Sequence, residues 1–130
     1  MKKKKKRIFA DLIEKYKGEG CEPYCRYFGE CGGCMFQNIE YTNQLLLKKE
    51  YINSVFEGIS SVESVAPSTP LNYRSRMDMV TAFGKKGLRK AGSFRHVVDI
   101  ETCAIMQNRS DEMYGTLRTL LEKIEDYDYL

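Results

Sequence analysis

Four of the five cysteines in this chain fall in a spacing that is typical of a metal centre. Cys25, Cys31 and Cys34 form a C-x5-C-x2-C run, and Cys103 lies far downstream. Four thiolates can complete the tetrahedral shell of a zinc ion or hold the four irons of a cubane iron–sulfur cluster. Because structural zinc usually uses two tight ligand pairs, a run of three with one remote cysteine favours the cluster and leaves zinc as the alternative.

The neighbouring residues indicate a ligand loop rather than a disulfide framework. Gly32 and Gly33 lack Cβ atoms, so they let the chain turn sharply and bring backbone N–H groups near the sulfurs. The odd cysteine count and the lack of a secretory signal segment argue against disulfide bonds. Cys21 is interpreted as a free thiol, although it could replace Cys25. The lone His96 is interpreted as a half-exposed strand residue and not as a ligand.

Length and hydropathy limit what the chain can be. At 130 residues it can hold a modest core, but not a cluster module together with a full catalytic domain. No apolar run approaches the length of a membrane span, so no membrane partner is expected. The lysine run at residues 2–7 has no apolar segment after it and is interpreted as a basic arm. Reduced thiols fit a cytoplasmic location.

The positive charge is concentrated in two zones. Residues 1–20 carry eight Lys or Arg against three Asp or Glu, and residues 72–97 carry seven against one. The remaining segments are acidic, although the whole chain has a net charge of +3. Two basic zones on an otherwise acidic chain suggest a polyanionic partner. For the lysine run, a solvated tail and a nucleic-acid-binding arm are equally compatible with the sequence.

Hydrophobic periodicity predicts an α+β fold in which helices flank a small antiparallel sheet. Helices are expected over residues 8–16, from about residue 42 to 56, and from a cap at Ser110. A cysteine loop should occupy 21–38, and strands are expected over 74–83, 88–90 and 96–100. The expected turn is Gly84-Lys85-Lys86-Gly87. The expected core residues on the second and third helices are Leu45, Leu46, Ile52, Val55, Phe56, Met113, Leu117, Leu120, Leu121 and Ile124.

The second basic zone is the candidate nucleic-acid surface. On a strand, Arg74 and Arg76 would point to the same face and present two guanidinium groups to phosphates or base edges. Arg89, Lys90 and Arg95 would extend that surface across the predicted turn. The alternative is a polar sheet face whose arginines pair with nearby acidic residues, namely Asp78 or Glu101.

Taken together, these blocks resemble the iron–sulfur RNA uridine-5-methyltransferases, which use S-adenosylmethionine to make 5-methyluridine in tRNA and ribosomal RNA. The resemblance covers roughly residues 21–110. In chain order, the matching blocks are Cys25-x5-Cys31-Gly32-Gly33-Cys34-x2-Gln37, Tyr41-x2-Gln44-Leu45-x2-Lys48, Tyr73-Arg74-x-Arg76, Gly87-Leu88-Arg89-Lys90-Ala91-Gly92-Ser93 and Asp99-Ile100-x2-Cys103-x-Ile105.

The resemblance implies that Cys25, Cys31, Cys34 and Cys103 ligate a [4Fe-4S] cluster in a module that grips folded tRNA or ribosomal RNA. The sequence therefore predicts a basic arm and short helix over residues 1–20, and with the resemblance an iron–sulfur RNA-recognition domain over 21–130. The family's N-terminal oligonucleotide-binding barrel is missing, as in the archaeal branch.

The family's Rossmann-like catalytic domain is also missing. There is no glycine-rich strand-to-helix loop for S-adenosylmethionine, and Cys103 is followed by Ala104 and not by the proline expected after the nucleophile. The chain is therefore expected to be a truncated or split form that is inactive alone, with catalysis supplied by another domain or a separate methyltransferase subunit. A zinc-stabilised nucleic-acid-binding module and a ferredoxin-like electron carrier remain as alternatives.

Overall fold

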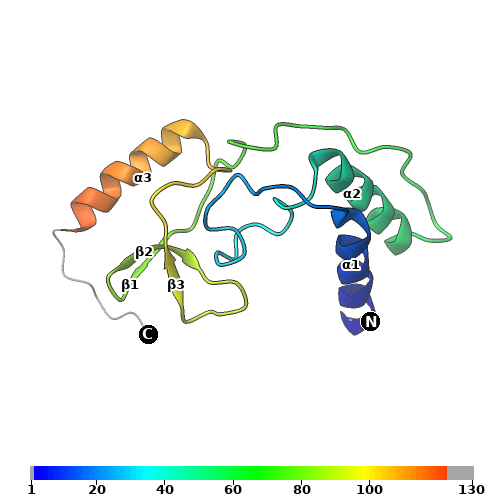
Figure 1. Cartoon of the computed structure of the whole chain (residues 1–130), viewed down its shortest axis with the longest axis horizontal. Helices are drawn as coiled ribbons and strands as arrows, with labels where there is room; N and C mark the ends of the chain where they lie inside the picture. Colours follow the sequence, from blue (N-terminus) through cyan, green and yellow to red (C-terminus); the bar gives the residue numbers. More distant parts are fainter. Residues whose placement is uncertain (1, 123–130) are drawn as a thin grey trace. The chain divides into compact units, whose positions relative to one another are not determined.

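The chain forms two packing units, and each is described by itself. The computed structural model describes residues 2–122, and the side chains of residues 8–122. Among the described residues, the helical unit comprises residues 2–23 and 36–68 and the sheet unit comprises residues 24–35 and 69–122; Figure 1 colours the chain by residue number. The functional boundary predicted between residues 20 and 21 stays a prediction.

The helical unit is a pair of helices, α1 (Lys2–Lys17) and α2 (Tyr41–Val55). Its buried centre is formed by Leu12 of α1, Leu47 of α2 and Ile39, which precedes α2. The rings of Phe36 and Tyr51 contact the ring of Phe9 edge-on, with centroids 5.7 and 5.1 Å away. A basic arm followed by a short helix was expected here; instead a single helix begins at Lys2 and continues to Lys17.

The predicted inner face of α2 is partly wrong. Leu47, which was not among the expected core residues, is fully buried, whereas Leu46 is half exposed. Val55 and Phe56, at the end of the helix, are exposed as well. Within the described part of the helical unit, α1 is the helix that packs on α2, so a narrower stripe of α2 is covered than its hydrophobic content suggested.

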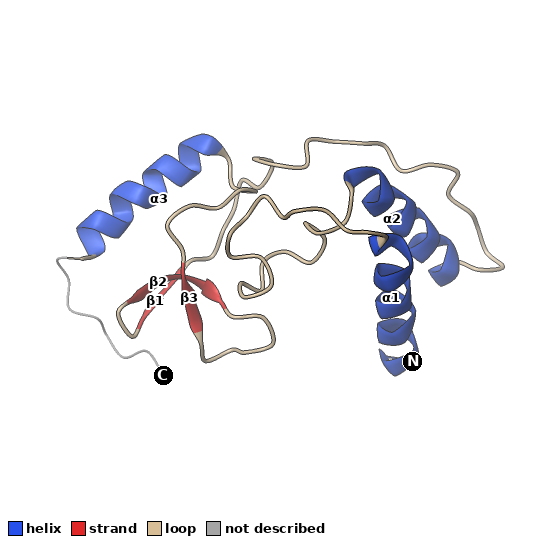
Figure 2. Ribbon diagram, viewed as in Figure 1, coloured by secondary structure: helices blue, strands red, loops and turns tan. Residues whose placement is uncertain are grey.

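The sheet unit contains the strands β1 (Val80–Ala82), β2 (Lys85–Arg89) and β3 (Val97–Asp99), followed by α3 (Asn108–Leu121). The strands pair antiparallel in the order β1-β2-β3 (Figure 2). Helices together with a small antiparallel sheet make the fold α+β, as the sequence predicted.

The hairpin turn lies two residues earlier than predicted. Ala82 pairs with Lys85, so Phe83 and Gly84 form the turn, and Lys85, Lys86 and Gly87 belong to β2. Phe83 and Gly84 have φ angles of 53° and 71°. Two-residue turns with positive φ at both positions match the twist of the flanking strands, and this turn places an unfavourable phenylalanine where Asn or Gly is usual.

The predicted strand over residues 74–83 is mostly not paired. Only its last part, β1, joins the sheet, while Arg74 forms an isolated bridge with Met106. Residues 75–79 lie outside the assigned strands. Arg74 and Arg76 therefore do not lie on a sheet face, because the alternation that suggested a strand is not matched by a hydrogen-bonded neighbour along this stretch.

The predicted core face of α3 is also wrong. Tyr114 is the buried residue of this helix, while Met113, Leu117 and Leu120 are 67%, 48% and 54% exposed. These three side chains line an open groove of about 570 Å³ that also contains Met77 and Met79 of the preceding segment. The helix begins at Asn108 after Gln107 rather than after a Ser110 cap. The predicted core residue Ile124 lies outside the described residues.

The paired strands β2 and β3 approach each other very closely at Gly87, which lies opposite Asp99. A Cβ atom at Gly87 would lie 2.1 Å from the carbonyl oxygen of Val98 and 2.8 Å from the nitrogen of Ile100. Next to it, the carbonyl of Lys86 accepts hydrogen bonds from the backbone N–H of Ile100 and from the hydroxyl of Tyr114, at 2.9 and 2.8 Å. Only glycine permits this approach of the two strands and α3.

No helix in the described part of the chain is long and apolar enough to cross a membrane.

Replacing Gly87 with alanine should destabilise the protein by at least about 3 kcal/mol, because the new methyl group overlaps backbone atoms of β3 that have no room to move. Gly115→Ala is the matched control. It adds the same methyl group in α3 where no atom lies within 4 Å, and should stabilise the helix by up to about 1 kcal/mol. Thermal and urea unfolding, followed by circular dichroism, measures the stability of both variants. Equal stability of Gly87→Ala and wild type would contradict the close approach of the two strands.

Candidate metal centre and nucleic-acid interface

The cysteine loop, residues 24–35, is attached to the chain just after β2. The N–H of Gly32 donates to the carbonyl of Arg89 at 2.9 Å, and the N–H of Ala91 donates to the carbonyl of Glu30 at 2.8 Å. Cys31 and Lys90 form an antiparallel bridge between these bonds. The short ladder fixes Cys31 relative to the sheet, although the loop has no regular helix or strand of its own.

Contacts around Glu101 bring the remote Cys103 to the same loop. The N–H of Glu101 donates to the hydroxyl of Tyr27 at 3.1 Å, and the Glu101 carboxylate pairs with the guanidinium of Arg26. The N–H of Cys103 donates to a carboxylate oxygen of Asp111 in α3 at 2.9 Å. Two residues of the loop and the first turn of α3 therefore hold the segment that carries Cys103.

Cys31 lies within electrostatic range of two other predicted ligands, Cys25 and Cys103. Burial is the largest cause that raises the pKa of the Cys31 thiol, and negative charge on Cys103 or Cys25 raises it further. Cys25 and Cys103 also line one cavity of about 420 Å³. Cys34, the fourth, lies in the same packing unit.

The glycine pair acts as the sequence predicted. The N–H of Gly33 donates to the sulfur of Cys31 at 3.3 Å, which lowers the pKa of the thiol. A Cβ atom at Gly33 would lie 3.4 Å from that sulfur, and one at Gly32 would lie 3.2 Å from the carbonyl of Arg89. Small residues here let the loop approach the sheet closely and direct an N–H group at a sulfur.

No set of three or more His, Cys, Asp or Glu side chains in the described part of the chain is arranged to hold a metal ion. A zinc ion with bonds of about 2.3 Å would require its four sulfurs to lie about 3.8 Å apart. A cubane cluster spans a larger volume, with one cysteine at each iron. The four thiols belong to one packing unit, and either group would require them to come closer together than they are arranged here. Like-charged thiolates repel one another, and a metal centre would remove that cost.

Cys21 belongs to the helical unit rather than to the unit of the other four cysteines. Its thiol donates to the carbonyl of Gln37 at 3.3 Å, and its backbone N–H donates to the carbonyl of Asn38 at 3.2 Å. Burial raises the pKa of this thiol. The local contacts agree with its interpretation as a thiol outside the ligand set.

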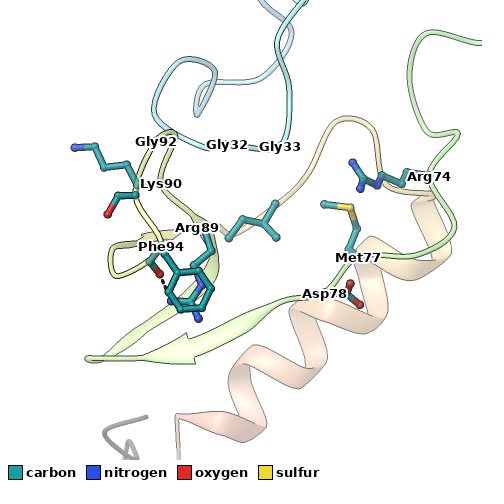
Figure 3. A pocket seen from close by; sticks show the side chains of 11 residues that line it. Gly32, Gly33, Arg74, Met77, Asp78, Arg89, Lys90, Gly92 and Phe94 are labelled. Atoms are coloured by element: carbon teal, nitrogen blue, oxygen red, sulfur yellow. Dashed lines mark hydrogen bonds between the residues drawn. The ribbon is translucent and has the colours of Figure 1, made fainter. Parts of the chain in front are cut away.

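Three of the five predicted RNA-binding residues line one groove. Arg74, Arg89 and Lys90 border a cavity of about 460 Å³, in which Arg89 and Phe94 lie on one side and Arg74 with Met77 on the other (Figure 3). Gly32 and Gly33 of the cysteine loop form part of the same wall. The basic groove therefore begins directly beside the predicted ligand loop.

The other two predicted residues lie outside this cavity. Arg76 forms an ion pair with Asp78 at 3.1 Å, which is the pairing that the alternative interpretation expected. Both side chains are more than 80% exposed, so the ion pair contributes little to the free energy of folding. Another anion, such as a phosphate, can therefore take the place of Asp78 beside Arg76. Arg95 is exposed on the loop before β3. Glu101 pairs with Arg26 and not with a residue of the basic zone.

The sequence interpretation missed Phe94, which lies between the two predicted basic residues Arg89 and Arg95. Its ring stacks on the guanidinium of Arg89, 4.3 Å from the ring centroid, and remains 80% exposed. An aromatic residue interleaved with basic ones was the available signal. His96 is exposed just before β3, where its Nδ1 is 2.7 Å from the hydroxyl of Ser93.

Asp99 connects the sheet to α3 close to the Cys103 segment. Its carboxylate accepts the N–H of Lys86 at 2.7 Å and two bonds from the Arg118 guanidinium, at 2.8 and 3.2 Å. The Arg118 bonds, followed by the Lys86 N–H, hold the pKa of Asp99 below its usual value. The same guanidinium donates to the carbonyl of Ile100 at 2.8 Å, so this ion pair also fixes the chain that leads to Cys103.

The chain has relatives among curated proteins. An uncharacterized RNA methyltransferase of Leptospira interrogans is 37% identical over 110 residues, or 82% of this chain and 24% of its own length. In Pyrococcus furiosus, a tRNA (uracil(54)-C(5))-methyltransferase is 32% identical over 99 residues and a 23S rRNA (uracil(747)-C(5))-methyltransferase is 31% identical over 103. The chain is similar to part of these RNA methyltransferases.

The matches cover 76% and 78% of this chain for the two Pyrococcus proteins. The chain spans about a quarter of the length of the curated relatives that it matches. No protein-family model matches the chain. The similarity therefore agrees with the resemblance to RNA methyltransferases, and it extends over only part of each relative.

Replacing Asp99 with asparagine should lower the free energy of unfolding by about 1–2 kcal/mol at neutral pH, since it weakens charged hydrogen bonds at a half-exposed site. Because the folded-state pKa of Asp99 lies below the unfolded value of about 3.9, this stabilisation is present above pH ~4 and is lost as the pH falls through the folded-state pKa. The measurement is urea unfolding of both proteins across pH.

The difference between wild type and Asp99→Asn should therefore shrink in acid. The matched control is Asp78→Asn, whose carboxylate forms a fully solvated ion pair and should leave stability nearly unchanged. If the difference in unfolding free energy between wild type and Asp99→Asn stayed constant from neutral pH to below the folded-state pKa of Asp99, the role given to the carboxylate charge would be contradicted.

Proposed function

We propose that this chain is the cluster-binding and RNA-recognition part of an S-adenosylmethionine-dependent RNA uridine-C5 methyltransferase that acts on tRNA or ribosomal RNA. The observation that carries the proposal is the joining of the ligand loop to the basic groove through Gly32 and Gly33. Relatives named for uracil-C5 methylation of tRNA and of 23S rRNA support the substrate class.

In this proposal Cys25, Cys31, Cys34 and Cys103 hold a [4Fe-4S] cluster. The cluster would serve as a structural cross-link between the loop and the Cys103 segment and would take no redox part in methyl transfer. The chain's own contribution is to position the sulfurs, through the ladder after β2 and the bonds to Glu101, and to donate the Gly33 N–H to Cys31.

The proposed RNA surface consists of the five basic residues Arg74, Arg76, Arg89, Lys90 and Arg95. Positive side chains fix the register of RNA by neutralising phosphates, a contribution that depends on salt and not on sequence. Residues 1–130 contain no glycine-rich strand-to-helix loop, so S-adenosylmethionine would bind to a catalytic domain of the same polypeptide or of a separate subunit.

Protein purified without oxygen should contain about four irons and four acid-labile sulfides per chain, with broad visible absorbance. Cys103→Ser should lose most of this iron, because it removes one ligand of the cluster. Cys21→Ser is the matched control, since it removes a thiol of the other packing unit and should keep the full complement. Iron, sulfide and zinc are measured together for all three proteins. A content of one zinc and no sulfide in wild type would contradict the cluster and support a zinc-stabilised module instead.

Removing Arg74 and Arg76 together should weaken RNA binding and reduce its salt dependence. For the double glutamine variant, the slope of log affinity against log salt should fall by up to about two phosphate contacts. A tRNA transcript titrated at several salt concentrations measures it. Arg109→Gln, paired with Lys48→Gln, removes two charges outside the groove and should change the slope less. If the double variant had the same salt slope as wild type, Arg74 and Arg76 would not contact phosphates and would not belong to the proposed RNA surface.

A further inference from the structure

We propose that the ring of Phe94 is a stacking platform for one unpaired nucleobase of the bound RNA. The inference rests on the proposed RNA-recognition function and adds to it a base subsite beside the phosphate contacts. It gives the loop between β2 and β3 a role in contacting a base, in addition to the binding of phosphates by its charged residues.

The ring is held in place but not buried. The guanidinium of Arg89 lies 4.3 Å from the ring centroid and also donates to the carbonyl oxygen of Phe94. A single arginine thus covers part of the ring and fixes the backbone that carries it (Figure 3). With 80% of Phe94 exposed, most of the ring surface remains in water. A folded protein gains little from such an arrangement, whereas a base can bury that surface on binding.

The space beside the ring suits a flat polar ligand. The cavity of about 460 Å³ falls within the range of about 300–1,000 Å³ that is usual for small-ligand sites. Three glycines, Gly32, Gly33 and Gly92, form part of its lining and leave room that side chains would fill. Met77 and Leu88 add apolar surface.

The charges around the cavity favour a nucleotide over an apolar ligand. Arg74, Arg89 and Lys90 line it together with a single carboxylate, Asp78, which Arg76 already pairs. Cations beside an exposed aromatic ring can bind the phosphates of a strand while one base stacks on the ring and on the guanidinium behind it. Bases inside a duplex are already stacked, so the subsite would take an unpaired nucleotide.

Phe83 provides a matched comparison within the same unit. It is also exposed, at 62%, but it lies in the β1–β2 turn and does not line the basic cavity. Phe83→Ala and Phe94→Ala therefore remove the same amount of aromatic surface, and only the second removes it from the groove.

The test uses the chain of residues 1–130, a fluorescent oligouridylate and an oligomer of the same length that has abasic riboses. Phe94→Ala should weaken oligouridylate binding about 5- to 100-fold, as loss of one stacked base does. The salt slope should not change, because no charge is removed, and binding of the abasic oligomer should be unaffected. Phe94→Trp should restore the affinity, and Phe83→Ala should bind as wild type does. Circular dichroism melting of every variant reports on folding.

Four outcomes overturn the inference. If Phe94→Ala binds oligouridylate as tightly as wild type and with the same salt slope, stacking is wrong while the RNA-recognition function stands. If Phe83→Ala loses as much affinity as Phe94→Ala, or if Phe94→Ala weakens the abasic oligomer equally, the loss is not due to a base on Phe94. If wild type binds neither oligomer nor a tRNA transcript, both the subsite and the proposed RNA-recognition function fail.

Discussion

The sheet unit depends on the close approach of the paired strands β2 and β3 at Gly87. At this point the Lys86 carbonyl accepts bonds from Ile100 of the following segment and from Tyr114 and Arg118 of α3. This one backbone oxygen thus accepts hydrogen bonds from the segment before Cys103 and from the helix after it. The last ligand of the predicted set lies more than sixty residues from the others in sequence, and this close approach is what directs its segment back to the loop. This polar convergence adds to an apolar interior, and no buried side-chain nitrogen or oxygen in the described part of the chain lacks a hydrogen-bond partner.

The elements whose evidence is local were predictable, and those set by their neighbours were not. Sequence spacing located the cysteine loop, the antiparallel sheet and the three helices, because glycines and periodic apolar residues act within a few positions. The orientation of α3 was wrong since Tyr114, which combines a buried ring with a hydroxyl that reaches two carbonyls, takes the inner position over the aliphatic Met113 and Leu117. Aliphatic periodicity cannot reveal that choice, which depends on where unpaired carbonyls of the sheet lie.

For the candidate site, spacing predicted which residues belong together but not the contacts that bring them together. The Gly33 N–H to Cys31 contact followed from composition alone. The role of Tyr27, whose hydroxyl accepts the N–H of Glu101, could not be anticipated, because it joins residues 74 positions apart. Phe94 was missed although it is interleaved with basic residues, because that pattern does not show whether the ring is buried; its 80% exposure beside Arg89 does.

The proposed cluster and the basic groove share a wall, and this sets what the cluster can contribute. Gly32 donates to the Arg89 carbonyl, so the position of the Arg89 backbone, and with it the cation that stacks on Phe94, depends on the conformation of the ligand loop. A loop of twelve residues without regular structure has considerable conformational entropy, which a four-cysteine centre would remove from the unbound state. Preorganising a cationic surface in this way lowers the entropy lost when RNA binds. A structural rather than a redox role for the cluster is therefore sufficient to connect the four cysteines with RNA recognition.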